Sequence, residues 1–264
     1  MNILDKIISY KRKEVEERKK LTSVKMLEQS EFFLLSNISV TKFLLDPEKS
    51  GIIAEHKRKS PSKGIINDKL TVEEVVKGYE AAGAAAVSVL TDTESFGGKD
   101  EDLIRARKVI NCPILKKDFI IDEFQILEAR ALGANIILLI AACLSPAEIK
   151  KLSEFTHSLG MEVLLEVHNE QELLPNCFDT INLIGVNNRN LKDFTVSIEN
   201  SIRLSELIPD KFLKVSESAI DSAETIIKLK GYGYKGFLIG ENFMRTNNPG
   251  KAMSELVQQL KVNH

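Results

Sequence analysis

The chain has 264 residues, of which 43% are hydrophobic and 28% are charged, and its formal net charge at pH 7 is -2. A chain of this length and composition can bury one large core, as α/β barrels of about 250 residues do. The near-neutral charge argues against nucleic-acid binding, which needs a clustered basic face. The longest apolar run, residues 136–143, is too short to cross a membrane.

Three cysteines, Cys112, Cys143 and Cys177, are widely spaced and lack the spacing of metal ligands. That pattern is typical of buried thiols in a reducing compartment. The first twenty residues contain no apolar core ahead of a small-residue cleavage site, so we expect no secretory signal. We therefore expect a soluble, cytoplasmic protein, and a monomer, because no long exposed apolar arm is evident.

Residues 1–50 precede the first expected strand and predict a helical extension. Residues 3–19 form an amphipathic pattern with Ile3, Ile7 and Tyr10 near one face. We interpret the charged residues of 11–20 as a solvated helix face. The apolar residues 32–35 are expected to be buried against another part of the protein. We expect these helices to lie over one end of the main domain; a partner-binding arm is the alternative.

From about residue 51 onward, short apolar runs alternate with amphipathic segments. The runs are nearly continuous in apolar residues, as in strands that are covered on both faces. They predict strands at 52–55, 86–90, 114–117, 136–140, 163–167, 181–186, 212–215 and 237–239. The segments between them predict helices at 72–82, 102–110, 123–132, 146–159 and 222–230.

Turn residues support these boundaries. Asp221 followed by Glu224 resembles an N-capping box, and Gly83, Gly133 and Gly160 stand where helices should end. Eight strands alternating with helices predict an α/β fold, the (β/α)8 TIM barrel, because eight parallel strands close into a barrel. An open doubly wound sheet is the main alternative, but no glycine fingerprint follows the first strand.

The expected organisation is therefore a single TIM-barrel domain over residues 1–264, with an N-terminal helical extension at 1–50 and the barrel at 51–264. Barrel enzymes place their chemistry at the carboxyl ends of the strands. The first strand ends with Glu55 and Lys57, which share a face because they are two residues apart. Later strand ends carry Lys117, Glu166, Asn187, Arg189 and Glu217.

Four of these residues, Glu55, Lys117, Glu166 and Glu217, come from alternate strands, and such residues share a layer inside a barrel. We expect three carboxylates to face two lysines and one arginine, so that the formal charges cancel. The alternative is a salt-bridge network that only orders the mouth of the barrel. A lysine among such charges can act as a general acid, or as an amine nucleophile if its pKa falls.

Other residues complete the expected mouth. His56 should point away from it, toward the helices, and His168 shares the parity of Glu166 but as a lone histidine is more often structural. Loops after strands seven and eight bind phosphate in many barrels, and Gly240 would allow close backbone approach. The expected phosphate-binding residues are Ser218, Ala219, Gly240 and Glu241, and the expected apolar ring is Phe96, Phe119, Leu138 and Leu191.

Six segments together resemble one known family. They read IIAEHKRKSPSKG at 52–64, ILKKDFIID at 114–122, LLEVHN at 164–169, IGVNNRNL at 184–191, VSESAI at 215–220 and FLIGENFMR at 237–245. With the opening helix, they are similar in order and spacing to indole-3-glycerol phosphate synthases. The resemblance implies ring closure of 1-(2-carboxyphenylamino)-1-deoxyribulose 5-phosphate to indole-3-glycerol phosphate, carbon dioxide and water, in tryptophan biosynthesis and without cofactor or metal.

The same resemblance implies roles for individual residues. Lys117 would be the general acid that protonates the substrate ketone, and Glu166 the later general acid or base in dehydration. Lys57 would pair with substrate anions and share in proton transfer, while Glu55 and Glu217 shape the charge network; which lysine makes which proton transfer stays open. Ser60, Asn187 and Arg189 would position the substrate's carboxylate and its sugar hydroxyls. The phosphate would be bound, mainly through backbone N–H groups, by Ser218, Ala219, Gly240 and Glu241.

Two positions depart from the family's pattern. Ala219 stands where the family usually has Gly, and Glu241 where some members have Ser, so we expect altered phosphate affinity and retained activity. One competing interpretation is another phosphosugar barrel that uses Lys117 as a Schiff-base nucleophile; a non-catalytic binding barrel is the other. Because the chain ends at His264, we expect no fused isomerase domain.

Overall fold

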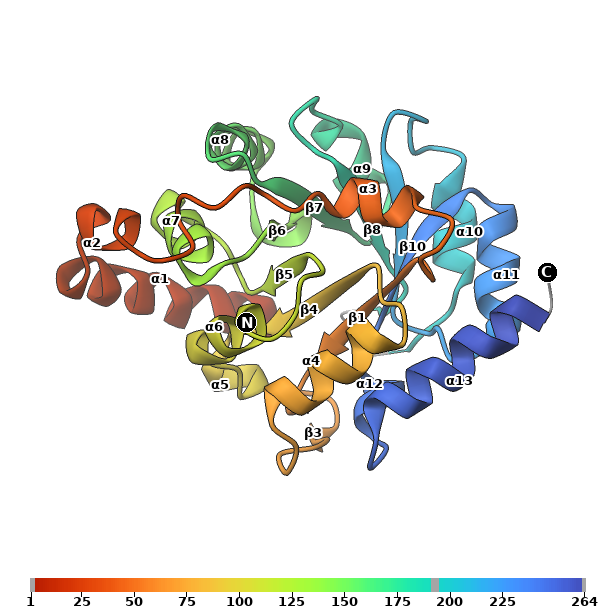
Figure 1. Cartoon of the computed structure of the whole chain (residues 1–264). Coiled ribbons are helices and arrows are strands. Elements are labelled where there is room, and N and C mark those ends of the chain that lie inside the picture. Colours follow the sequence, from red (N-terminus) through yellow and green to blue (C-terminus); the bar gives the residue numbers. More distant parts are fainter. Residues whose placement is uncertain (1–2, 191–194, 263–264) are drawn as a thin grey trace.

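The computed structural model describes residues 3–190 and 195–262. Eight parallel strands form a closed barrel in the order β1-β10-β9-β8-β7-β6-β5-β4, and β4 pairs with β1 to complete the circle (Figure 1). The closed barrel confirms the TIM barrel and excludes the open sheet. The strands are β1 Ile52–His56, β4 Ala86–Leu90, β5 Ile114–Lys117, β6 Ile136–Ile140, β7 Glu162–Val167, β8 Leu183–Asn187, β9 Leu213–Glu217 and β10 Tyr234–Ile239.

Helices surround the barrel (Figure 1). The longer ones are α4 Val72–Ala81, α6 Asp100–Arg107, α7 Glu123–Leu132, α8 Pro146–Ser158, α10 Glu199–Ser205, α11 Ala223–Gly231 and α13 Pro249–Val262. The shorter ones are α5 Thr93–Phe96, η1 Ala141–Cys143, α9 Glu170–Leu173, η2 Leu174–Asn176 and α12 Glu241–Met244. Every predicted helix is present, while α10 and α13 were not predicted. A small antiparallel pair, β2 Lys59–Ser60 with β3 Gly64–Ile65, lies in the loop after β1.

The helix boundaries test the predicted turn residues. Gly83, Gly133 and Gly160 all have positive φ and stand at helix ends, as predicted. The predicted capping box at Asp221 and Glu224 is wrong by one residue. The side chain of Ser222 caps α11 by accepting a hydrogen bond from the backbone N–H of Thr225.

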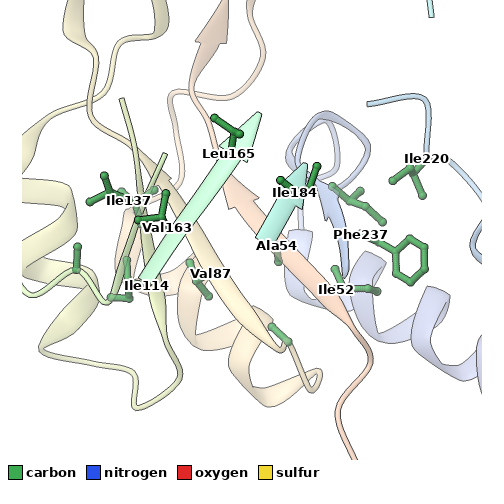
Figure 2. Close-up of a cluster of buried hydrophobic side chains, with 14 of the residues drawn as sticks. Ile52, Ala54, Val87, Ile114, Ile137, Val163, Leu165, Ile184, Ile220 and Phe237 are labelled. Carbon is green, nitrogen blue, oxygen red and sulfur yellow. The ribbon is translucent and has the colours of Figure 1, made fainter. Parts of the chain in front are cut away.

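Strand residues alternate between two apolar layers. Outward-facing residues pack between the strands and the helices, and Figure 2 draws part of that cluster, with Ile52, Val87 and Ile184 among the labelled residues. Inward-facing residues such as Ile53, Leu115 and Leu164 fill the barrel. Because side chains alternate along a strand, the next inward positions at the carboxyl ends fall on Glu55, Lys117 and Glu166. The core therefore fixes the direction in which the polar strand ends point.

The N-terminal helices are α1 Ile3–Leu21, α2 Val24–Glu28 and α3 Val40–Leu45. They cover both ends of the barrel, so the expectation of one covered end is wrong. Ile7 of α1 lines the mouth at the carboxyl ends of the strands. At the opposite end, Val40 and Leu44 of α3 pack into the inner cluster, and Ser39 and Thr41 beside them hydrogen-bond Glu162 at the start of β7.

Two further expectations for this segment need correction. Lys11 is fully buried, so the charges of residues 11–20 are not all on a solvated face. Lys11 is buried because carboxylates of the barrel surround its ammonium group, as described below. The apolar residues 32–35 are only partly covered, since Phe32 is buried while Leu34 and Leu35 are exposed. Among the residues described, no helix combines the length and the apolarity that crossing a membrane requires.

Candidate active site

A cavity of about 450 Å³ opens at the carboxyl ends of the strands. It gathers nearly all the residues expected at the mouth from their positions in the sequence. Leu191 lies outside the described residues, so its expected place in the apolar ring is not described. The expected residues that line the cavity are Glu55, Lys57, Ser60, Phe96, Lys117, Phe119, Leu138, Glu166, Asn187, Arg189, Glu217, Ser218, Ala219, Gly240 and Glu241.

The charged layer of the cavity centres on the ammonium of Lys117. Its Nζ donates to Oε2 of Glu217 at 2.6 Å and lies 3.4 Å from Oε2 of Glu166. Lys57 pairs with Glu55 at 2.7 Å, as their shared face predicts. The strands β1, β9, β7 and β5 alternate around the barrel. The expected layer of alternate-strand residues is therefore present, with three carboxylates around two ammonium groups.

Two glycines give these carboxylates room. A Cβ added at Gly240 would lie 2.6 Å from Oε1 of Glu55, and one added at Gly185 would collide with Oε1 of Glu217. Gly240 was expected to let a phosphate approach, but its nearest neighbour within the protein is the Glu55 side chain. Gly185 was not singled out, because its partner lies 32 residues away on the next strand. Any larger residue at either position would push a carboxylate out of the layer.

Burial and proximity move the pKa values of the layer apart. For Lys117, burial favours the neutral amine, but the carboxylates of Glu217 and Glu166 outweigh it and raise the pKa. For Glu217, burial raises the pKa to about 7, since attraction to Lys117 is offset in part by repulsion from Glu166. Burial also opposes ionisation of Glu166, but Lys117 and then His168 outweigh it and lower that pKa. At neutral pH the layer therefore holds an ammonium, a carboxylate and a carboxyl group close to half-protonation.

Asn187 and Arg189 follow β8 into the same cavity. The amide of Asn187 donates to Oε1 of Glu166 at 3.2 Å, so the carboxylate is held from two sides. Arg189 does not pair with the three carboxylates of the layer as the expected balance required. Its guanidinium lies 4.0 Å from Glu241, whose other oxygen lies 3.9 Å from Arg245. Glu241 is thus a fourth carboxylate, turned toward two arginines.

An apolar wall faces the charges. The rings of Phe96 and Phe119 lie 6.1 Å apart, centre to centre, at an interplanar angle of 34°. Ile3, Leu4 and Ile7 of α1 line the cavity beside them. The sequence contained a signal for these three residues, their spacing on one helix face, but it did not tell which end of the barrel the helix covers. The cavity therefore combines a charged floor with an aromatic and aliphatic side.

Backbone donors stand at the end of β9. Ser218 and Ala219 have φ values of 65° and 57°, a left-handed conformation that non-glycine residues seldom adopt. Consecutive residues in such a turn can direct their N–H groups into one concavity, which suits an anion. Glycine adopts this conformation without steric cost. Ala219 keeps the backbone donor and carries the strain.

A buried ionic cluster ties α1 to the outside of the same loops. Nζ of Lys11 lies 3.0 Å from both Asp92 and Asp118, and Tyr10 donates to Asp92 at 2.8 Å. Asp118 also lies 3.3 Å from Nζ of Lys116. We call Lys11, Asp92, Lys116 and Asp118 the anchor cluster. The anchor cluster includes the two residues that flank Lys117 in the chain, Lys116 and Asp118. Sequence reasoning missed the cluster because its other members are far away in the chain.

A second set of contacts extends the anchor along α1. Arg18 pairs with Asp100, lies 2.8 Å from Glu128 of α7, and pairs with Glu14 of its own helix. Several carboxylates thus converge on one guanidinium, which is suited to multiple hydrogen bonds. The N-terminal helix is therefore fixed to the barrel by buried and partly buried charges as well as by Ile7 and Val15.

Comparisons with known proteins show the family of the chain. The family model for indole-3-glycerol phosphate synthase matches residues 4–256. A protein of that name from Bacteroides thetaiotaomicron is 44% identical over 260 residues, which cover 98% of this chain and 99% of the relative. Another, from Campylobacter hominis, is 42% identical over 260 residues, 96% of this chain and 98% of the relative.

Solved structures support the fold independently. The crystal structure of 3-hexulose-6-phosphate synthase from Salmonella typhimurium matches with a TM-score of 0.63 at 13% identity, over 81% of this chain and 99% of that one. KGPDC from Streptococcus mutans matches with a TM-score of 0.62 at 13% identity, over 80% and 97%. At 13% identity these likenesses show the fold alone, whereas the sequence relatives extend over nearly the whole chain. The chain belongs to the indole-3-glycerol phosphate synthase family and is a carboxy-lyase of tryptophan biosynthesis.

Proposed function

We propose that Lys117 is the general acid of the ring closure. The observation that carries the proposal is its ammonium, held 2.6 Å from Glu217 and 3.4 Å from Glu166 inside a cavity that also presents aromatic rings. Attack of the aromatic carbon on the ketone leaves negative charge on oxygen. A positioned ammonium stabilises that charge and supplies its proton.

The charges around Lys117 favour an acid over a nucleophile. A lysine that forms a Schiff base needs a neutral amine, and hence a lowered pKa. Here the carboxylates of Glu217, Glu166 and Glu55 outweigh the opposing effect of burial, and the pKa is raised. The amine therefore stays protonated at neutral pH, which disfavours the aldolase-type alternative.

Glu166 is the residue that we assign to dehydration. Once the ring has closed and carbon dioxide has left, the former ketone oxygen must leave as water and a neighbouring carbon must lose a proton. Glu166 faces Lys117 across the layer and accepts a hydrogen bond from Asn187. It is thus placed to exchange protons with the same part of the substrate. Lys57, paired with Glu55, would hold a substrate anion or share in these transfers.

The two ends of the substrate match two parts of the cavity. The phosphate would lie against the backbone N–H groups of Ser218, Ala219, Gly240 and Glu241, and the left-handed turn at Ser218 and Ala219 supports that assignment. The anthranilate ring would lie near Phe96, Phe119 and Leu138, with Ser60, Asn187 and Arg189 positioning its carboxylate and the sugar hydroxyls. The carboxylate of Glu241, drawn toward Arg189 and Arg245, leaves the phosphate end to backbone donors.

We also propose a single-domain monomer over residues 1–264 that acts in the cytoplasm. The anchor cluster supports a single domain, because it buries charges of residues 1–50 against the barrel. Gel filtration with light scattering measures the mass, and a species of twice the 29.5 kDa chain mass would contradict the monomer.

The roles are tested by turnover of the carboxyphenylamino-deoxyribulose phosphate, followed by indole fluorescence. Wild-type protein should form product, and Lys117→Ala should be slower by about 10²-fold or more. Unimpaired turnover by the variant would remove Lys117 from the acid role. Borohydride added during turnover should trap no adduct, whereas a covalent adduct at Lys117 would establish the Schiff-base alternative.

A further inference from the structure

The overall reaction consumes a proton. The substrate's carboxylate leaves as neutral carbon dioxide, and its ketone oxygen leaves as water after taking up two protons. One proton returns when the carbon next to nitrogen loses hydrogen to form the indole ring. The ionised substrate and one proton thus give indole-3-glycerol phosphate, carbon dioxide and water. One proton must therefore enter the site in every turnover.

Bound substrate would cover the mouth through which solvent could supply that proton. The side chain of Glu166, at the floor of the cavity, is only 8% exposed even in the open site. A second cleft lies beside the first and shares Asn187 and Arg189 with it. Its lining includes His168 and Glu172. Glu166 itself lines only the first cavity, so His168 stands between Glu166 and the second cleft.

A chain of three side chains connects Glu166 to that second cleft. Nε2 of His168 lies 3.5 Å from Oε1 of Glu166, and Nδ1 lies 3.1 Å from Oε2 of Glu172. Side-chain exposure rises along the chain, from 8% for Glu166 through 10% for His168 to 20% for Glu172. We propose that His168 carries protons from Glu172 and solvent to Glu166. This inference rests on the proposed role of Glu166 in dehydration.

The contacts of the imidazole fit a transfer path. Glu172 accepts from the backbone N–H of His168 at 2.8 Å as well as facing its ring, and Asn169 donates to the other carboxylate oxygen. The ring is therefore held toward Glu172 on one side. On the other side, Nε2 is buried and has no hydrogen-bond partner among the described residues. An imidazolium N–H without a partner beside a carboxylate can hydrogen-bond to it after a small movement of either side chain.

The charges that face His168 come from three elements. Glu166 lies on β7, Glu172 on α9 and Glu217 on β9; Cys143 of η1 interacts with both Glu166 and Glu172. Burial disfavours the imidazolium, but Glu172 and Glu166 outweigh it and raise the pKa of His168. The ring therefore stays protonated to higher pH than an exposed histidine. As the pH rises through that pKa, the imidazolium and the proton supply are both lost.

In each turnover the path conserves protons. The imidazolium N–H of His168 protonates the Glu166 carboxylate, which passes that proton to the departing hydroxyl, and the hydroxyl leaves as water. The neutral amine of Lys117, which gave its own proton to the ketone oxygen, takes up the proton that the carbon next to nitrogen loses. Glu172 then returns a solvent proton to the neutral imidazole, so that each group regains the proton it gave. His168 touches no reacting atom and acts through Glu166, so it is a positioning residue whose ring also passes protons.

Single-turnover experiments with excess enzyme test the path, because they report the chemical steps without product release. His168→Asn keeps a donor near Glu172 but cannot pass a proton, and we expect its rate to fall about tenfold or more. His168→Ala should fall similarly, and added imidazole should restore part of its rate, most strongly at pH values where imidazole is protonated. Wild-type protein should not respond to imidazole. His157→Ala, at a histidine on the distant helix α8, is the matched control and should react at the wild-type rate.

Two results would overturn the path. One is a wild-type rate in His168→Asn; the other is a His168→Ala defect that imidazole leaves unchanged over the whole pH series. Glu166→Gln separates this failure from failure of the proposed function. If Glu166→Gln is inactive while His168→Asn is unimpaired, the relay alone is wrong. If Glu166→Gln also reacts at the wild-type rate, both the relay and the proposed role of Glu166 in dehydration are wrong.

Discussion

Two adjacent lysines show how differently this barrel treats buried charge. Lys116 and Lys117 are neighbours at the end of β5, and the alternation of the strand sends one outward and the other into the mouth. Lys116 is fully buried and contacts Asp100, Asp118 and Thr91. Lys117 contacts Glu217 and Glu166 in a cavity. Both ammonium groups are surrounded by carboxylates, yet the two surroundings differ in whether every buried polar atom has a hydrogen-bond partner.

In the anchor cluster, every carboxylate oxygen is engaged. Asp118 accepts from the backbone N–H of Phe119 and from the hydroxyl of Thr91, while Asp92 accepts from Tyr10 and from the backbone N–H of Ser95. Burial opposes ionisation of Asp118, but Lys116 and Lys11 outweigh it and hold its pKa far below the usual range. Asp118 therefore stays ionised near neutral pH, and the cluster holds structure.

The surroundings of Lys117, by contrast, include buried polar atoms that have no hydrogen-bond partner among the described residues. Two such atoms are Oε1 of Glu217 in the mouth and Nε2 of His168 behind Glu166. Burial also raises the pKa of Glu217 to about 7. Buried polar groups without partners are costly to folding, so atoms kept in this state are free to take up or pass on protons. Lys116 therefore lies beside a carboxylate whose oxygens all have partners, whereas Lys117 lies beside one with an oxygen that has none in the described part of the chain.

Lys116→Met should have the largest effect on stability. It leaves Asp118 and Asp100 without one of their cations in a buried setting, and breaking a buried pair costs about 3–5 kcal/mol. We expect the free energy of unfolding in urea to fall by about 3–4 kcal/mol. Lys150→Met, on the exposed face of α8, is the matched control and should change it by less than about 0.5 kcal/mol. Equal effects of the two substitutions would refute a structural role for the anchor cluster.

Glu217→Gln should affect the reaction and spare the fold. It removes the charge that holds the ammonium of Lys117 at 2.6 Å. Hydrogen bonds to charged groups contribute about 1.5–3 kcal/mol, which corresponds to a rate loss of about 10- to 100-fold. Stability above neutral pH should not fall, because glutamine places no charge in the barrel. Turnover close to the wild-type rate, or unfolding at lower urea concentration, would contradict the assignment of Glu217 to the mouth's working charges.

Ala219→Gly should have the smallest effect. Position 219 has a φ of 57°, and a non-glycine residue in that region costs about 1–2 kcal/mol. We expect about 1 kcal/mol of added stability, reduced from the upper value by the greater freedom of glycine in the unfolded chain. The KM for substrate should change while kcat is retained. If neither stability nor KM responds, the left-handed turn is not the phosphate-binding element.

The parts predicted best from sequence are those set by local pattern. Strand alternation placed Glu55 and Lys57 on one face and His56 on the other, and the eight apolar runs gave the closed barrel. The inward direction of Glu55, Lys117, Glu166 and Glu217 depended on nothing more than this alternation. Such inferences succeed because a buried strand admits only two side-chain directions.

The parts missed depend on distant partners. Lys11 is charged and lies within a run of charges, so its burial follows only from Asp92 and Asp118, more than 80 residues away. The pairing of Arg189 with Glu241 and the fit of Gly185 against Glu217 have the same origin. The capping error at Ser222 is different, since Asp221 and Ser222 are both good caps and local preference does not separate them.

The central claim is that the mouth keeps a carboxyl group whose proton exchanges near neutral pH. Because its folded-state pKa is raised, Glu217 binds a proton more tightly in the folded chain than in the unfolded one. Its contribution to stability is therefore complete below about pH 4.5, the ordinary pKa of glutamate, and is lost as the pH rises through about 7. Asp118, with a lowered pKa, has the opposite sign and loses its contribution only in strong acid.

Infrared titration of the protonated-carboxyl band tests this claim most directly, with Glu217→Gln identifying the signal. We predict a band in the wild-type protein that is missing from the variant and that disappears with a midpoint near pH 7. A wild-type spectrum in which this band has already vanished by about pH 5, as for an ordinary glutamate, would contradict it.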